Sequence, residues 1–382
     1  MNTIIYLGGF RLPDNNSSAI RALGLTRAFQ SLGFNVELGG KIGDNIDDQK
    51  YSDIKFWNIE DLKGEMVQSD KNINPIINKI EDIGFDNIKA IIAYNYSPIA
   101  FYQLFNYCKN NNIKLIQDIT EWYGIDGEFT FQKLIRMVLT NWRIAILGPK
   151  TKNLIVSVNF LKRKFKKENC LILPQLSIST YFRQNQNYLL KGDIIKFIYI
   201  GNPGKKFSKE KVDWCINIFS NLSLKYKNFS FEIVGIDTDY FSDKLKLLSK
   251  INKSDNIVLH GKLSHKKALS LLKKSNFSVF FRPNTRVSKI GYAGKIREAF
   301  DCGVPIVTNN TGDISIYTKT NVNGYVINSF NEFEIQVEIE KILNKRYEEL
   351  NKVIKNCRSK NPFSIEYFNE KIMSFLNNLK TL

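Results

Sequence analysis

Short apolar runs alternate with amphipathic stretches along most of the chain, and this alternation constrains the fold more than any other feature of the sequence. Such runs are typical of buried strands, and the stretches between them carry apolar residues at helical spacing. Strand–helix units repeated in this way predict a parallel sheet covered by helices on both faces. In the first half we expect strands at Thr3–Leu7, Asn35–Leu38, Ile88–Ala93, Lys114–Gln117 and Asn153–Val156, with helices at Ala19–Leu32 and Pro98–Asn111.

The same alternation starts again after a polar, aperiodic stretch at Arg183–Asp193, where we place a domain boundary. The strands expected there are Ile195–Ile200, Phe229–Val234, Asn256–Leu259, Phe277–Phe281 and Ile306–Asn309. The helices expected there are Lys209–Leu224, Tyr240–Lys250, Ser264–Lys274 and Lys295–Asp301. The sequence therefore predicts an α/β protein of two doubly wound, Rossmann-like domains over residues 1–187 and 188–360. Such sheets bind ligands at the carboxyl ends of their strands, so we expect the site in an interdomain cleft.

The last part of the chain, residues 361–382, carries a helix signal of its own. Pro362 and Ser364 mark a start. An apolar stripe follows at Phe368, Ile372, Phe375, Leu376 and Leu379. We expect this helix to pack back on the first domain, with contact to a membrane as the alternative use of the stripe.

Composition is that of a globular protein, with 43% hydrophobic and 24% charged residues in a chain of 382. The formal net charge is +18. A basic surface would attract phosphates or anionic lipids. The lysines are spread along a sequence that is also rich in asparagine and isoleucine, so compositional bias explains the charge equally well. Because no helix-turn-helix, zinc or aromatic RNP pattern accompanies the charge, we predict no nucleic-acid partner.

Cysteine and histidine usage argues against disulfides and metal. Five cysteines are scattered without paired spacing, which fits reduced thiols in the cytoplasm. The two histidines, His260 and His265, are five residues apart, and this spacing does not align them on one helix face. We therefore expect no metal and no cofactor.

Any membrane role should be peripheral. The N-terminus "MNTIIYLGGF" reads as a first strand rather than a signal peptide, and no run of 18 apolar residues occurs. The basic amphipathic pattern at Phe131–Arg143 fits either helix packing or contact with the inner face of a membrane. We expect a cytoplasmic protein that associates peripherally with that face.

The first candidate site is "YLGGFRLPDNNSSAIRAL", read as a strand, a Gly8-Gly9 turn, a loop and a helix that Ser17 or Ser18 caps. Glycines after a strand let the backbone approach a ligand closely, and the helix N-terminus attracts anions. Gly8, Gly9 and Arg21, which lies on that helix, are our candidates for ligand binding in the first domain. A tight turn, however, needs glycine in any case.

The second candidate site opens the second domain with "FIYIGNPGKKFSKEKVDW". A strand ends at Gly201, the turn continues to Gly204, and Lys205 and Lys206 follow before a helix. Two lysines beside a glycine turn could neutralise a diphosphate as point charges. A solvated lysine pair on a loop is the alternative.

A third candidate is "GYAGKIREAFDCGVP", in which a short helix lies between two apolar strands. Lys295, near the N-terminus of that helix, is unfavourable unless an anion binds there, whereas Glu298 suits the helix dipole. Glu298 could accept hydrogen bonds from ribose hydroxyls. The alternative is an ion pair between Lys295 and Glu298 on an exposed helix face.

Two carboxylates follow a strand of the first domain in "LIQDITEWYG". We expect Asp118 and Glu121 to project from the carboxyl end of this strand into the cleft, where a carboxylate could orient a hydroxyl. Capping of the next helix is the alternative for either residue.

These stretches, in their order and spacing, resemble the GT-B fold nucleotide-sugar glycosyltransferases, most closely the retaining family 4 group of bacterial polysaccharide pathways. The resemblance covers nearly the whole chain. It is carried by "GGF…SSAIRALGLTRAFQSLGFNVE", "LIQDITEWYG", "IYIGNPGKK" and "KIREAFDCGVPIVTNNTGD".

The resemblance implies a donor site in the second domain. Glu298 matches the second glutamate of the E-x7-E motif, which holds the donor ribose. The cations that would face the diphosphate are Lys295, Arg282 and either Lys205 or Lys206. The turn at Gly201 would lie beside them. Gly261 to Leu263 would lie by the base. The chain departs from the motif at Ile290, where the first glutamate is expected, and at Gly294, where a proline is usual.

The resemblance also implies the reaction. It makes Gly8, Gly9 and Arg21 the candidates for acceptor binding. It places Asp118 and Glu121 near the acceptor hydroxyl and Lys295 at the diphosphate leaving group. We expect metal-independent transfer of a sugar, with retention, from a nucleotide-sugar donor to a glycan or lipid-linked acceptor in surface polysaccharide or glycoconjugate synthesis. The alternatives are a nucleotide-sugar epimerase and a catalytically inactive nucleotide-sugar binder. The "DTD" at Asp237–Asp239 looks like the D-x-D metal motif of the other major transferase fold, but we read it as a solvated loop.

Overall fold

A computed structural model describes residues 3–14, 16–43, 51–59, 73–124, 130–178, 190, 194–291 and 294–382, with the side chain of Lys205 left out. The chain forms two compact units. Unit 1 comprises Met1–Ile178, Ile290–Tyr292 and Phe363–Leu382, and unit 2 comprises Ser179–Lys289 and Ala293–Pro362. The expected boundary at residues 187 and 188 lies outside the described residues.

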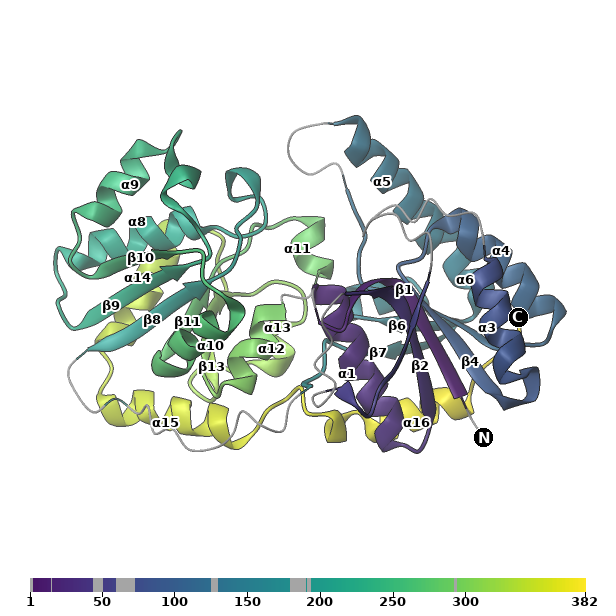
Figure 1. Cartoon of the computed structure of the whole chain (residues 1–382). Helices are drawn as coiled ribbons and strands as arrows, with labels where there is room; N and C mark the ends of the chain where they lie inside the picture. Colours follow the sequence, from purple (N-terminus) through teal and green to yellow (C-terminus); the bar gives the residue numbers. More distant parts are fainter. Residues whose placement is uncertain are drawn as a thin grey trace. The chain divides into compact units, whose positions relative to one another are not determined.

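Unit 1 is built on a parallel sheet, as the strand–helix alternation predicts. Its strands are β1 Thr3–Leu12, β2 Asn35–Ile42, β3 Lys55–Asn58, β4 Ile88–Tyr94, β5 Leu115–Ile119, β6 Asn153–Val156 and β7 Asn169–Ile172. They lie in the order β3-β2-β1-β4-β5-β6-β7 (Figure 1). Every pairing between these strands is parallel.

Helices cover both faces of this sheet. They are α1 Ser17–Ser31, α3 Asn74–Ile83, α4 Pro98–Asn110, α5 Phe131–Trp142, α6 Gly148–Thr151, α7 Asn159–Lys162 and α16 Asn369–Asn377, with a π-helical segment at Arg143–Leu147. Residues of α3 and α4 pack with Ile5 and Leu7 of β1 in one buried cluster. Since side chains alternate along a strand, Tyr6 points to the opposite face, where α1 contacts β1 and β2.

The C-terminal helix packs on unit 1, as predicted. Ile372 and Leu376 of α16 are buried. The side-chain amide of Asn169, in β7, donates to the carbonyl oxygens of Phe375 and Asn378, each at 3.1 Å. These bonds satisfy carbonyls at the end of the helix and fix it to the edge of the sheet.

Unit 2 is built on a second parallel sheet. Its strands are β8 Ile195–Ile200, β9 Phe229–Val234, β10 Ile257–Gly261, β11 Phe277–Phe280, β12 Ile306–Asn309 and β13 Gly324–Ile327, in the order β10-β9-β8-β11-β12-β13. The helices are α8 Val212–Ser223, α9 Leu245–Asn252, α10 His265–Lys274, α11 Arg286–Ile290, α12 Gly294–Asp301, α13 Ile314–Tyr317, α14 Glu332–Leu343 and α15 Tyr347–Ser359 (Figure 1). In both units the strand order reverses at the first strand, which is the doubly wound arrangement that was predicted.

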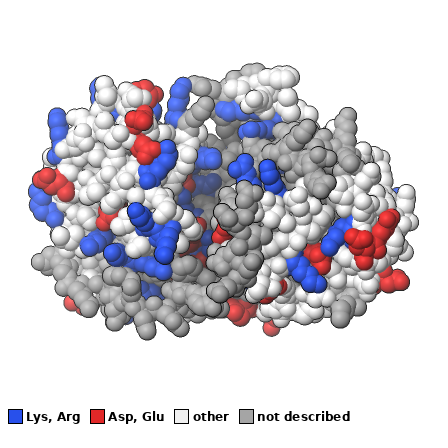
Figure 2. Space-filling model, viewed as in Figure 1, with Lys and Arg blue, Asp and Glu red and all other residues white. Residues whose placement is uncertain are grey.

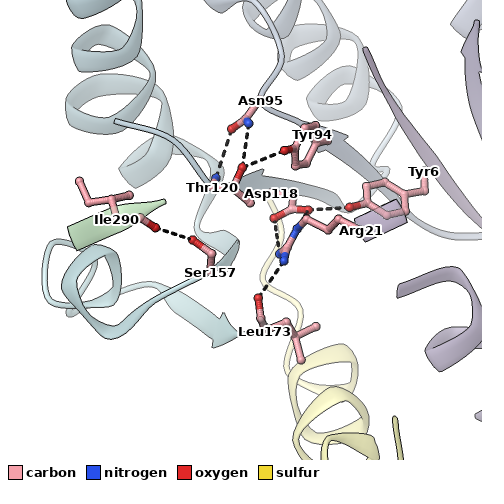
Figure 3. A network of polar contacts seen from close by, with 9 residues as sticks. All are labelled: Tyr6, Arg21, Tyr94, Asn95, Asp118, Thr120, Ser157, Leu173 and Ile290. Atoms are coloured by element: carbon pink, nitrogen blue, oxygen red, sulfur yellow. Dashed lines mark hydrogen bonds and ion pairs between the residues drawn. The ribbon is translucent and has the colours of Figure 1, made fainter. Parts of the chain in front are cut away.

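Ile290, which stands where the resembling family has a glutamate, is a core residue of unit 1. It is fully buried in a cluster with Ile119, Ile144 and Leu154. The hydroxyl of Ser157 donates to the carbonyl oxygen of Ile290 at 3.2 Å (Figure 3). An ionised carboxylate among these side chains would carry a large desolvation cost, so the apolar residue suits the position.

Candidate functional site

At the carboxyl edge of the unit 2 sheet lie three glycines, which carry no side chain that would cover the main chain. Gly201 follows β8, Gly235 follows β9 and Gly261 ends β10, and these three strands are neighbours. All three have positive φ, at 151°, 99° and 69°. A Cβ on Gly235 would lie 2.6 Å from the carbonyl oxygen of Gly201, so only glycine lets these loops approach so closely. The sheet therefore presents main-chain atoms rather than side chains at this point.

Lys295 lies directly over this bare backbone. A Cβ on Gly201 would be 2.6 Å from the Lys295 Nζ. The ammonium forms an ion pair with Glu210 and lies 4.4 Å from the ring centroid of Tyr199 and 5.4 Å from that of Phe280. The Tyr199 hydroxyl also donates to Glu210, at 2.7 Å. These contacts hold a cation at the N-terminus of α12 and against the end of β8.

Arg282, just after β11, is the second cation at this edge. Arg282 is 9% exposed, and its Nη1 donates to the Ser288 carbonyl at 2.8 Å. The side-chain amide of Asn309 accepts from the main-chain N–H of Arg282 and donates to its carbonyl oxygen. Burial lowers the pKa of Arg282 to about 10, and the charge of Glu210 opposes this shift. Glu210 therefore forms the ion pair with Lys295 and, through its charge, also favours the protonated form of Arg282.

Glu298 lies one turn further along α12. Its carboxylate is 3.5 Å from His265 Nε2 and 3.5 Å from a guanidinium nitrogen of Arg297. Burial by itself would raise the pKa of Glu298, but the hydrogen bond of His265 and the charges of Arg297, His265 and Lys295 outweigh it and lower the pKa. Glu298 is therefore an anionic hydrogen-bond acceptor at neutral pH. Lys295 and Glu298 each have another partner, so the alternative of an isolated pair between them is not what holds either residue.

The lysine pair of the Gly204 turn is described only in part, because the Lys205 side chain lies outside the described residues. Lys206 is exposed with a left-handed φ of 50°, and its charge acts on Asp243. The prediction that one of these two lysines faces a diphosphate stays a prediction.

The "DTD" stretch serves its neighbouring loop. Asp237 Oδ1 accepts the main-chain N–H of Lys262 at 2.9 Å, and its Oδ2 is 2.5 Å from Lys262 Nζ. A Cβ on Gly261 would lie 3.2 Å from the same Asp237 Oδ1. Across the described residues, no group of three or more His, Cys, Asp or Glu side chains is arranged to hold a metal ion.

In unit 1, Asp118 does not project from the sheet, and that expectation is wrong. The residue is fully buried, and its carboxylate accepts from Arg21 Nη2 at 2.8 Å, from Arg21 Nε at 3.0 Å and from the Tyr6 hydroxyl at 2.6 Å (Figure 3). Arg21 is 4% exposed and also donates to the Leu173 carbonyl at 2.9 Å. Asp118 and Arg21 therefore tie α1 to the sheet and to the segment after β7. The expectation that Arg21 faces an acceptor is corrected with it.

The Gly8-Gly9 turn and its serine cap are also corrected. Both glycines lie inside β1, and a Cβ on Gly8 would be 2.8 Å from the Phe10 ring and 2.9 Å from Tyr94 Cβ. Close packing, rather than a turn, thus explains Gly8. The residue that caps α1 is Asn16, whose side chain accepts from the main-chain N–H of Ala19 at 2.8 Å.

Glu121 lines a pocket of unit 1, at the loops that follow β4 and β5. The pocket is lined by Asn95, Tyr96, Ser97, Pro98, Glu121, Tyr123, Arg136, Leu139, Thr140 and Arg143. Unlike Asp118, Glu121 is partly exposed. The pattern "LIQDITEWYG" indicated this region. The sequence did not connect it with the two arginines of the pocket, Arg136 in α5 and Arg143 in the π-helical segment.

Basic and acidic side chains occur together on the one face that Figure 2 shows. On the face shown in Figure 2, Lys and Arg side chains are scattered over both units with Asp and Glu among them.

Comparison with known proteins finds a family match over most of the second unit. Residues 183–360 match the family model described as glycosyl transferases group 1. No curated protein matches the chain by sequence.

Solved structures share the fold of the whole chain. HepE of Anabaena, in complex with UDP and glucose, has a TM-score of 0.64 at 13% identity over 99% of this chain and 100% of its own. TarM of S. aureus, in complex with fondaparinux, alpha-GlcNAc-glycerol and UDP, has a TM-score of 0.64 at 12% identity over 99% and 100%. A glycosyltransferase of Rickettsia africae has a TM-score of 0.69 at 14% identity over 99% and 98%. At these identities the likeness shows the two-domain GT-B fold.

Proposed function

We propose that this chain, whose residues 183–360 match the family described as glycosyl transferases group 1, is a glycosyltransferase that moves a sugar from a nucleotide-diphosphate sugar to a glycan or lipid-linked acceptor. The observation that carries the proposal is the cation cluster at the glycine edge of unit 2, inside the matched region. There the Lys295 ammonium lies over Gly201 and forms an ion pair with Glu210, and the charge of Glu210 also acts on Arg282. Solved relatives in fold, HepE and TarM, were determined with UDP.

We assign the donor diphosphate to the main chain around Gly201, over which the Lys295 ammonium lies. Lys295 would exchange part of its ion pair with Glu210 for a phosphate oxygen, and Arg282 would add a second positive charge. Both cations would stabilise the charge that grows on the diphosphate as the bond to the anomeric carbon breaks. Glu298, held anionic by His265 and Arg297, would accept hydrogen bonds from the ribose hydroxyls.

The acceptor oxygen forms the new bond to the anomeric carbon, the bond from that carbon to the diphosphate oxygen breaks, and the hydroxyl proton leaves with a base or the departing phosphate. Glu121 is our candidate to orient this hydroxyl, because it is the partly exposed carboxylate of the unit 1 pocket. Retention of configuration at the anomeric carbon is part of the proposal. Independence from metal is also part of it, because Lys295 and Arg282 would supply the positive charge that a metal ion supplies in other transferases.

We also propose peripheral association with a membrane through α5. Phe131, Ile135, Val138 and Trp142 are 71%, 38%, 52% and 37% exposed and follow one another at helical spacing. Lys133 lies on the same helix, which contains no acidic residue. An exposed apolar stripe with basic neighbours is typical of helices that lie on anionic membranes. No helix among the described residues is long and apolar enough to cross a membrane.

The proposed activity is tested by a thermal-shift screen of the whole chain against uridine, guanosine, adenosine and thymidine diphosphate sugars. We expect one nucleotide class to raise the melting temperature, because a ligand that binds only the folded state stabilises it. Consumption of that donor should then depend on an added glycan or lipid acceptor and should persist in EDTA.

Other outcomes separate the alternatives. Acceptor-independent conversion of the donor would point to an epimerase, and binding without turnover on any acceptor to an inactive binder. The absence of any nucleotide-dependent shift would contradict the proposal. Loss of turnover in EDTA would contradict metal independence alone.

A further inference from the structure

The pocket of unit 1 contains a buried arginine whose hydrogen-bonding capacity is not used up within the protein. Arg143 is 5% exposed, and its Nη2 donates to the main-chain oxygen of Glu121 at 3.1 Å. Its Nε is buried and has no hydrogen-bond partner among the described residues. Because an unmade hydrogen bond of a buried charged group is costly, the arrangement points to an oxygen atom supplied by a ligand.

A helix N-terminus borders the same pocket. Ser97 and Pro98 begin α4, a helix of 13 residues. The Ser97 side chain makes no capping hydrogen bond, and the first turn has no acidic residue. The first N–H groups of α4 therefore keep a positive pole toward the pocket, where an anion would be stabilised.

The two loops that carry these groups are fixed to each other. Asn95, with a left-handed φ of 42°, donates through Nδ2 to the Thr120 hydroxyl at 2.9 Å and accepts from the Thr120 N–H at 3.2 Å. Its own N–H donates to the Asp118 carbonyl at 2.9 Å, and the Tyr94 hydroxyl joins Thr120 at 2.9 Å (Figure 3). This network holds the start of α4 beside the segment that contains Glu121, so the pocket is organised before any ligand binds.

The charges that line the pocket select an anion with a neighbouring hydroxyl. Arg136 and Arg143 contribute two positive charges, and among the described residues of the lining Glu121 is the single carboxylate. From this arrangement we infer that the pocket binds an oxyanion of the acceptor, a phosphate or a carboxylate, between Arg143, Arg136 and the start of α4. Glu121 would then accept a hydrogen bond from a hydroxyl of the same acceptor. The inference rests on the proposed function, since it names the chemical class of the acceptor.

The test uses inorganic phosphate and methyl phosphate as probes, with methanol as the uncharged control, in thermal-shift titrations of the whole chain. We expect both phosphates to stabilise the wild type, and to stabilise Lys295→Ala as well, because that variant weakens only the proposed donor site of unit 2. Arg143→Gln and Arg136→Gln should bind the phosphates at least about tenfold more weakly, because a charge-assisted hydrogen bond is lost. Lys133→Gln, on the same helix but outside the pocket lining, is the matched control and should behave as the wild type.

The opposite pattern overturns the inference. If Arg136→Gln and Arg143→Gln keep the phosphate-dependent shift while Lys295→Ala loses it, phosphate binds only at unit 2. No shift in the wild type overturns it as well. Should Arg143→Gln not fold, the partly exposed Arg136 gives the same comparison. Stabilisation by nucleotide sugar is followed in each variant, so a failed oxyanion site is distinguished from a failed glycosyltransferase assignment.

A second arm distinguishes two sources of the anionic group. Vesicles of phosphatidylcholine with or without phosphatidic acid are sedimented with the wild type and with Arg136→Gln. Binding that requires phosphatidic acid and falls in Arg136→Gln assigns the site to a lipid phosphate. Vesicle binding that is equal in both proteins, with the methyl phosphate shift still dependent on Arg136, assigns it to a soluble phosphorylated or acidic glycan.

Discussion

Asp118 shows what residue-level reading of this sequence can and cannot supply. A carboxylate at the carboxyl end of a parallel strand has the position of a functional group. Its actual partners are Arg21, which is 97 residues away in sequence, and Tyr6, which is 112 residues away. Burial raises the pKa of Tyr6, as does the charge of Asp118, so the phenol stays a donor. The sequence held no sign of this pairing because it is made by tertiary packing.

Removing one partner of this pair should destabilise unit 1 strongly. We expect Arg21→Met to lower the free energy of unfolding by about 3–5 kcal/mol, since it leaves a buried carboxylate without its cation. The double variant Arg21→Met/Asp118→Leu should be less destabilised than Arg21→Met alone. Denaturant unfolding followed by tryptophan fluorescence suits the test, because Trp57, Trp122 and Trp142 are all in unit 1. A loss below about 1 kcal/mol in Arg21→Met would show that the pair is not a structural support.

At the scale of elements, the central strands and the edge strand β10 were predicted, whereas the other edge strands were not. Four strands, Asn153–Val156, Ile195–Ile200, Phe229–Val234 and Ile306–Asn309, have the bounds that the sequence predicted. The strands that sequence reasoning missed are β3, β7 and β13, all at sheet edges. An edge strand is covered by fewer neighbours and needs fewer consecutive apolar residues, so its pattern is weak. The glycines of β1 misled for a related reason, because the contact with Tyr94 that excludes a side chain is invisible in the sequence.

Helix α5 has an exposed apolar face, which we propose contacts a membrane. We expect the double variant Ile135→Gln/Val138→Gln to bind anionic vesicles at least about fivefold more weakly than the wild type, because both side chains lose their apolar contact with lipid. Co-sedimentation with vesicles at two lipid compositions measures this. Phe333→Gln, which changes a side chain of unit 2 that is 71% exposed, is the matched control. Equal binding of all three proteins would rule out α5 as the contact.

At the scale of the whole molecule, the restarted strand–helix alternation was enough to predict two doubly wound units. Of the donor candidates, Lys295 lies over Gly201 and pairs with Glu210, and the charge of Glu210 also acts on Arg282. Glu210 and His265 were missed, because a single acid in a basic loop and a single histidine at a helix start carry no pattern. The apolar residue at position 290 is explained by packing in unit 1. The segment Ile290–Tyr292 belongs to that unit although it lies between the two stretches of sequence that form unit 2, and Ile290 is part of the unit 1 core.

The central claim divides the work between the units, with the donor in unit 2 and the acceptor in unit 1. The most direct test measures nucleotide affinity and sugar transfer side by side in Lys295→Ala and Glu121→Gln, with Lys266→Ala, an exposed lysine of α10, as control. We predict that Lys295→Ala weakens nucleotide binding at least about tenfold and removes most transfer. Glu121→Gln should keep nucleotide affinity within about twofold and lower transfer roughly a hundredfold. Unchanged affinity and transfer in Lys295→Ala, or lost nucleotide binding in Glu121→Gln, would contradict this division.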